Sequence, residues 1–160
     1  MSKLIIKLIF IIYLASALSC SYKPIFSEKN YNFGIEEISF ADEGSKDINR
    51  IIKNRFDLIQ EVNNRKQKKY SLAVKTSKIR NIISKDSKGD PVKFELFIIA
   101  DYEIIENQKI IFSKIIEKKE IYDNNSDKFK LGQEEKIILD NLSKRISDEI
   151  LTSIVNLNDN

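Results

Sequence analysis

The sequence contains no histidine, and it has only one cysteine, Cys20, and four glycines among 160 residues. Without histidine the commonest general base and metal ligand is missing, and a zinc site built from histidine and cysteine is excluded. The four glycines lie too far apart to form a phosphate-binding loop, and no serine lies in a Gly-x-Ser-x-Gly turn. We therefore expect neither a bound metal nor a cofactor.

Carboxylates that are paired in the sequence do not supply the missing chemistry. Glu36 and Glu37, like Glu134 and Glu135, are adjacent, so their side chains point to opposite faces of a strand or diverge on a helix. General acid–base catalysis needs groups that converge on a substrate. We expect solvated surface carboxylates, no catalytic residues and no enzyme activity.

Residues 1–19 have the features of a cleavable export signal. Lys3 and Lys7 give a positive start, and an apolar run from Leu8 to Leu18 ends in small residues before Cys20. At about 1.5 Å per residue, the stretch from Leu4 to Leu18 would span only ~22 Å of the ~30 Å hydrocarbon core of a membrane. A permanent membrane span is therefore disfavoured.

The junction Ala17-Leu18-Ser19-Cys20 resembles a bacterial lipobox. In a lipobox the cysteine takes a diacylglyceryl group on its sulfur and becomes the acylated first residue after cleavage. We expect Cys20 to be the lipidation site; the alternative is a plain signal peptide followed by a chance cysteine. With Cys20 acylated no thiol remains, so the core must stabilise the fold without disulfides.

The charge of the chain is nearly balanced once the signal is removed. Without Lys3 and Lys7, the 27 basic residues fall to 25 against 24 acidic ones, a net charge of +1. Nucleic-acid binding needs a concentrated basic surface that displaces counterions. We expect no nucleic-acid partner.

The residues from Phe33 to Val62 predict a strand followed by a helix. Phe33–Phe40 is rich in aromatic and β-branched residues, and a polar turn with Gly44 follows it. From Ser45, a suitable cap, apolar residues recur at helical spacing; they are Ile48, Ile51, Ile52, Phe56, Ile59 and Val62. We expect this helix to end near Asn63-Asn64.

Three more strands and a second helix follow. Tyr70–Ser77 alternates apolar and polar residues, and Ile79 breaks the phase, which predicts a bulge or strand end near Ser77. Residues 92–122 predict an antiparallel hairpin whose first strand turns one face to the core: Val92, Phe94, Leu96, Ile98, Ala100, Tyr102 and Ile104. A helix is predicted by the spacing of Leu131, Ile138, Leu142, Ile146, Ile150 and Ile154.

These elements predict an α+β fold, in which two helices pack on one face of a mainly antiparallel four-stranded sheet. The expected order is β-α-β-β-β-α. We expect a signal peptide in residues 1–19, a lipidated tether in 20–32, one α+β domain in 33–155 and a disordered tail in 156–160.

The hairpin also carries apolar residues on the parity opposite its core face: Phe97, Ile99, Ile105, Ile111, Ile115 and Ile121. Apolar residues on an uncovered sheet face favour an interface, with Phe97, Ile99, Ile111 and Ile115 as its candidates. The alternatives are cover by the tether or simply an isoleucine-rich composition.

Residues 62–88 contain nine basic residues and a single acid, Asp86. A cluster of this kind is a candidate for binding an anion such as phosphate, and a solvated lysine-rich surface is the alternative. The candidate side chains are Lys75, Lys78, Arg80, Lys85 and Lys88.

The segment Cys20-Ser21-Tyr22-Lys23-Pro24-Ile25-Phe26 resembles the opening of the lipopolysaccharide-assembly lipoprotein family, LptE, and most closely its alphaproteobacterial branch. The likeness continues through the strand and helix of Ile35–Val62, the hairpin Phe94–Tyr122 and the final helix with Ile146-Ser147-Asp148-Glu149-Ile150.

The resemblance implies a non-catalytic lipoprotein, anchored by its lipid to the periplasmic side of the outer membrane. It would sit inside an LptD-type β-barrel, help that barrel assemble and assist lipopolysaccharide delivery. Lipopolysaccharide is then a second partner, and the basic residues are candidates for its phosphates. The alternatives are an auxiliary or solute-binding periplasmic lipoprotein of an ABC transporter, and an unrecognised hydrolase.

Overall fold

The computed structural model describes residues 31, 33–63 and 68–158. Along this part of the chain the elements are β1 (Phe33–Phe40), α2 (Lys46–Asn63), β2 (Lys68–Lys85), β3 (Pro91–Glu106), β4 (Lys109–Asp123) and α3 (Lys128–Asn158). The order β-α-β-β-β-α and the α+β class are as predicted. The predicted signal peptide, and the tether with Cys20, lie outside the described residues except for Tyr31.

The four strands form one mixed sheet in the order β1-β2-β3-β4. β1 runs parallel to β2, and the other neighbours are antiparallel. A parallel pair needs a long crossover, which α2 provides. The tight turn between β3 and β4 has positive φ angles at Asn107 (50°) and Gln108 (63°), as in the type I′ turns that suit the twist of hairpins.

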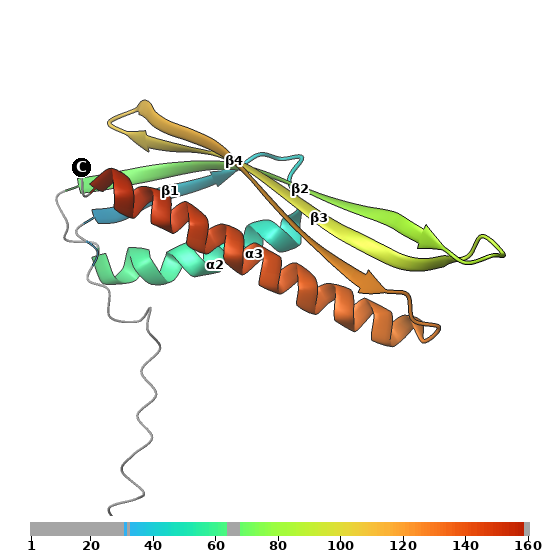
Figure 1. The fold of residues 1–160 in the computed structure, drawn as a ribbon. Coiled ribbons are helices and arrows are strands. Elements are labelled where there is room, and N and C mark those ends of the chain that lie inside the picture. Colours follow the sequence, from blue (N-terminus) through green and yellow to red (C-terminus); the bar gives the residue numbers. More distant parts are fainter. Residues whose placement is uncertain (1–30, 32, 64–67, 159–160) are drawn as a thin grey trace, which may run out of the picture. The chain divides into compact units, whose positions relative to one another are not determined.

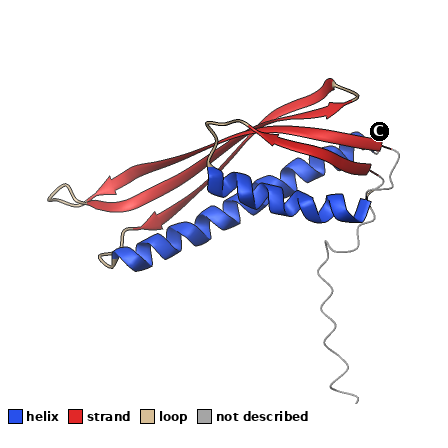
Figure 2. Cartoon of the chain, turned by 180° about the vertical axis from the view of Figure 1, so that it is seen from behind, coloured by secondary structure: helices blue, strands red, loops and turns tan. Residues whose placement is uncertain are grey.

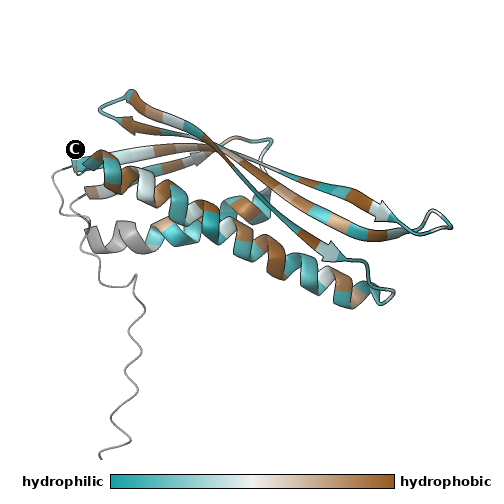
Figure 3. Ribbon diagram, viewed as in Figure 1, coloured by the Kyte–Doolittle hydropathy of each residue, from teal (hydrophilic) through white to brown (hydrophobic). Residues whose placement is uncertain are grey.

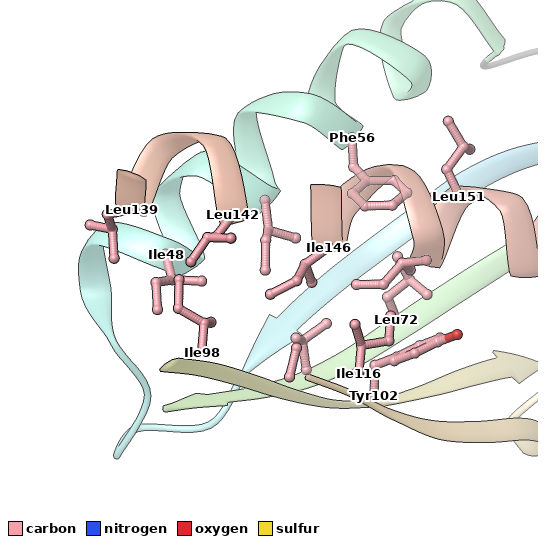
Figure 4. Close-up of a cluster of buried hydrophobic side chains, with 14 of the residues drawn as sticks. Ile48, Phe56, Leu72, Ile98, Tyr102, Ile116, Leu139, Leu142, Ile146 and Leu151 are labelled. Carbon is pink, nitrogen blue, oxygen red and sulfur yellow. The ribbon is translucent and has the colours of Figure 1, made fainter. Parts of the chain in front are cut away.

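Both helices lie on the same side of the sheet, as Figure 2 shows from behind. Their apolar faces meet the inner face of the strands, and Figure 4 shows residues of both helices pointing toward the sheet. Fully buried side chains come from both helices and from the sheet: Ile48 and Phe56 from α2, Leu142 and Ile146 from α3, and Tyr102 from β3. The core therefore lies between the helices and the inner sheet face.

Helix α3 follows the predicted apolar spacing but continues further than predicted. It ends at Asn158, so the predicted tail is corrected for Asn156–Asn158. Ile154 is fully buried, and Val155 and Leu157 pack against the core, which gives the last turn a reason to stay helical. The predicted positions Ile59 and Val62 of α2 lie outside the described side chains.

Strand β2 does not end near Ser77, so this prediction is corrected as well. Its pairing with β3 stays regular to Ile82, and the register shifts occur around Ser84. Beyond Thr76 the strand is exposed on both faces, so no buried face imposes alternation on the sequence. For the same reason Val92, on the predicted core face near the far end of the sheet, is 40% exposed.

Polar contacts fix where the helices begin. The side chain of Asp127 accepts hydrogen bonds from the amides of Phe129 (3.0 Å) and Lys130 (3.2 Å), which caps α3. Before α2, the Ser45 amide donates to the Thr76 hydroxyl (3.1 Å), which in turn donates to Asn49. This contact ties the start of α2 to the middle of β2.

Candidate functional site

The basic candidates lie along the part of β2 that β1 does not cover. Pairing between β1 and β2 ends at Phe40 and Val74. Beyond Thr76, seven consecutive residues from Ser77 to Ile83 are exposed. Figure 1 shows this half of β2 running beside β3 to their shared turn. We call Ser77–Ile82, the regularly paired part of this stretch, the free β2 edge.

The five basic candidates do not form one cluster. Lys75 lies opposite Asp101 on the outer sheet face, away from the helices, and its Nζ is 3.9 Å from the Glu43 carboxylate. Lys78 and Arg80 lie opposite the buried Ile98 and Leu96, and therefore on the inner face. Lys85 and Lys88 are exposed at the turn between β2 and β3. The strand group is thus divided between two faces.

Arg80 is engaged with side chains from three other elements. Its guanidinium carbon lies 3.8 Å from the ring centroid of Phe94 on β3. Its Nε donates to the Tyr122 hydroxyl of β4 (3.0 Å) and is 3.6 Å from the Glu135 carboxylate of α3. Burial, with the Glu135 carboxylate nearby, raises the pKa of the Tyr122 hydroxyl above its ordinary value. Arg80 therefore connects the far part of the sheet to α3.

The turn between β2 and β3 is ordered by Asp86. Its carboxylate accepts hydrogen bonds from the amides of Lys88 (2.9 Å) and Asp90 (2.8 Å). Gly89 takes a φ of +89° here, a conformation that side chains rarely adopt. The turn presents Lys85 and Lys88 to solvent on a defined backbone.

The apolar candidates occupy the outer face as predicted, with one exception. Phe97 lies between Ile79 and Lys119, and Ile99 lies between Ser77 and Glu117. Both are half-buried, whereas Ile115 is 59% exposed. Figure 3 shows apolar bands mixed with polar ones along these strands.

The exception is Ile111. The pairing of β3 with β4 shifts between Ile104 and Ile105, so Phe112 and Ile110 take the paired positions and Ile111 falls in the irregularity. Sequence parity could not show this shift.

Sequence reasoning also missed Ile79. This residue is 43% exposed beside Phe97, and it lies beyond Ser77, near which the sequence predicts a bulge or the end of the strand.

A groove of about 540 Å³ lies between α2, β2 and α3. It is lined by Asp47, Arg50, Ile51, Lys78, Gly132, Glu135, Lys136, Leu139 and Asp140. This groove could not be predicted from the sequence, because its residues come from three separate elements. We call it the inner groove; it opens beside the free β2 edge at Lys78.

The described residues were compared with the ligand groups of metal sites and with membrane-spanning helices. In that part of the chain, no group of three or more potential metal ligands occurs. No described helix is long and apolar enough to cross a membrane. The described surface has an exposed strand edge, an apolar sheet face and a groove.

Comparison with solved structures places this fold among bacterial lipoproteins. Rare lipoprotein B of Shewanella oneidensis superposes with a TM-score of 0.58 at 18% identity, over 77% of this chain and 96% of that one. Lipoprotein B of Nitrosomonas europaea gives 0.61 at 14% identity, over 81% and 88%. The chain shares the fold of these lipoproteins.

A minor lipoprotein of Acinetobacter baumannii agrees, with a TM-score of 0.53 at 15% identity over 77% of this chain and 92% of that one. No family model and no curated protein sequence matches the chain. At these identities the likeness establishes the fold, and the fold covers nearly the whole of each related protein.

Proposed function

We propose that the chain is an outer-membrane lipoprotein that binds and helps assemble an LptD-type β-barrel and assists lipopolysaccharide transport to the outer leaflet. One observation carries the proposal: the described residues have the fold of rare lipoprotein B of Shewanella oneidensis. The resemblance of Cys20–Phe26 to the opening of the LptE family supports the finer assignment. The position of Cys20 at the end of an apolar segment supports a lipid anchor.

The surface of the domain supports a binding role. The outer sheet face exposes apolar side chains, including Ile79, Ile115 and Ile121 at 43%, 59% and 54%, between charged neighbours. Apolar residues spread over an uncovered face are typical of an interaction surface. In this proposal the outer face meets the wall of the barrel.

The test is co-purification. The full chain with a C-terminal tag, extracted from outer membranes in mild detergent, should bring down one large β-barrel protein, identified by mass spectrometry. Recovery of an inner-membrane transporter complex in place of a barrel would favour the ABC-transporter alternative. Recovery of neither would contradict the proposal.

The turn between β2 and β3 is the place that we propose for contact with lipopolysaccharide phosphates. Lys85 and Lys88 are exposed there, whereas Arg80 is already engaged with Phe94, Tyr122 and Glu135. Charge-assisted hydrogen bonds to phosphate are strong, and exposed charges are screened by salt. The double variant Lys85→Glu, Lys88→Glu should bind purified lipopolysaccharide more weakly, and salt should weaken the wild type.

A further inference from the structure

We propose that the free β2 edge binds an extended, acidic segment of a partner protein, which adds to the sheet as a strand in line with β1. The edge consists of six residues, Ser77–Ile82, and at ~3.3 Å per residue it is about 20 Å long. Four observations support this proposal. The edge has backbone groups that face away from β3, and its pairing with β3 is regular. Its inner face carries basic side chains, and its outer face carries apolar ones.

At every second residue of this edge, the backbone amide and carbonyl point away from β3. The amide of Ala41 donates to the carbonyl of Val74 (3.1 Å), so Val74 points its backbone groups to the side that β1 occupies. These groups alternate in direction along a strand, and pairing with β3 is regular from Ser71 to Ile82. Lys78 and Arg80 therefore point their amides and carbonyls to the same side, past the end of β1.

The edge has room for a strand. Every residue from Ser77 to Ile83 is exposed, and the register shift that would distort an added strand lies beyond Ile82. Among the described residues, β1 pairs with Lys68–Val74, the part of β2 that precedes the free β2 edge. An added strand would continue a pairing that the fold already makes.

The inner face of the edge is short of negative charge. Each acid of the inner groove already pairs with another residue: Asp47 with Arg50 (3.6 Å), Glu135 with Arg80 (3.6 Å) and Asp140 with Lys144 (2.7 Å). Lys78 and Lys136 line the same groove, and neither makes an ion pair within the described part of the chain. An added strand with carboxylates on its inner side would place them near Lys78 of β2 and Lys136 of α3.

The outer side of the edge favours apolar residues. Ile79 is 43% exposed and lies beside the half-buried Phe97. Because strand side chains alternate, the segment that fits has carboxylates at one parity and apolar, β-branched residues at the other. A second copy of this chain does not fit, since pairing of two such edges brings Lys78 close to Arg80, and like charges opposite each other destabilise a pair.

The probe is a fluorescein-labelled peptide of about ten residues, an upper length for ordinary strands, with Glu and Val in strict alternation. Binding to the full chain in mild detergent is measured by fluorescence anisotropy. We expect saturable binding below about 1 mM that weakens with added salt. The same peptide with Lys in place of Glu should not bind.

Two variants at one position separate backbone pairing from charge. Lys78→Ala removes the charge and keeps the amide, whereas Lys78→Pro removes the edge-facing amide as well and leaves the pairing with β3 intact. Binding to Lys78→Pro should be at least about fivefold weaker than to Lys78→Ala, the effect of one lost backbone hydrogen bond.

Equal affinity of the two variants would overturn strand addition, and equal binding of the lysine peptide would overturn the acidic partner. If Lys78→Pro does not fold, a Glu-Val peptide that is N-methylated at alternate residues replaces it, and undiminished binding of that peptide to the wild type would overturn the inference. A dimer of the chain seen by light scattering without peptide would also overturn the inference. So would the absence of any binding of the Glu-Val peptide to the wild type. The assay contains neither barrel nor lipopolysaccharide, so its failure would leave the proposed function standing.

Discussion

Glu149 joins α3 to β4 through two lysines. Its carboxylate accepts from Lys118 Nζ at 2.6 Å and from Lys114 Nζ at 2.9 Å, and its side chain is 31% exposed. The hydrogen bonds from Lys118, and then from Lys114, lower the pKa of Glu149 below its ordinary value of 4.5. The folded state therefore favours the ionised carboxylate, and protonation of Glu149 must weaken the contact between α3 and the sheet.

We expect Glu149→Gln to lower the free energy of unfolding by about 1 kcal/mol at pH 7, the upper range for partly exposed ion pairs. Because the folded-state pKa is the lower one, this contribution is present above pH 4.5 and is lost as the pH falls through the folded value. Urea unfolding of both proteins at several pH values measures the difference. A difference that does not shrink at low pH would contradict the assignment.

The matched control is Glu117→Gln, which removes a carboxylate from the exposed outer face of β4. Its stability should stay within about 0.5 kcal/mol of the wild type at every pH, as for most surface substitutions. The comparison separates the ion pairs of Glu149 from the general effect of removing a negative charge.

Arg80 provides a second residue-level prediction. Arg80→Ala removes the contact with the Phe94 ring and the hydrogen bond to Tyr122, so we expect a loss of about 1–2 kcal/mol. Arg80→Lys keeps the charge but not the planar group that stacks on the ring, and should recover only part of this loss. Urea unfolding of both variants gives the values, and an Arg80→Ala protein as stable as the wild type would refute the contact.

Arg80 also shows the limit of reading single residues from a sequence. Its charge in a basic stretch suggested a phosphate contact, which remains a prediction for Arg80 as for the other four basic candidates. Its actual neighbours come from β3, β4 and α3, and only the register of the sheet brings them together. Sequence patterns identify which face a residue takes, but not which distant side chains share that face.

Among the elements, the two faces of β4 allow a sharp test, because adjacent isoleucines point in opposite directions. Ile115 is 59% exposed on the outer face, and Ile116 is 2% exposed in the core. Ile116→Glu buries an unpaired carboxylate and should unfold the protein or destabilise it by roughly 4 kcal/mol. Ile115→Glu should stay within about 0.5 kcal/mol of the wild type.

The same pair tests the proposed contact with a barrel. Ile115→Glu should fold normally, as judged by circular dichroism and urea unfolding, and yet recover less of the barrel in co-purification. Full recovery of the barrel would show that the outer face is not the contact. Unfolding of Ile115→Glu would show that the two faces of β4 have been assigned the wrong way round.

The elements were predictable where one of their faces is buried. The helices and the hairpin follow apolar spacing, since burial against a single core imposes a period on the sequence. The end of β2 and the exposure of Val92 were not predictable, because both lie where the sheet extends past its cover. The parallel pairing of β1 with β2 was also beyond the sequence, as strand order depends on contacts between distant residues.

At the scale of the whole molecule, the described residues form a sheet with helices on one face and none on the other, and with a strand edge that β1 leaves half free. The helices bury the inner face up to about Thr76, and the outer face and the free β2 edge are the surfaces that we propose for partners. A lipid on Cys20 would hold these surfaces at a membrane. The proposed function therefore depends on acylation of a residue outside the described part of the chain.

We expect Cys20→Ala to move the protein from the membrane pellet to the soluble periplasmic fraction. Each CH₂ group of an acyl chain contributes about 0.8 kcal/mol on insertion, and one chain alone gives only marginal binding. Several acyl chains therefore hold a domain at the membrane, and a domain without them is released. Ser21→Ala, which changes the adjacent residue and keeps the thiol, should stay in the pellet. Ultracentrifugation and intact-mass measurement of the N-terminus decide the matter. Retention of Cys20→Ala in the membrane, with no lipid mass on the wild-type N-terminus, would show that the cysteine follows a plain signal peptide by chance.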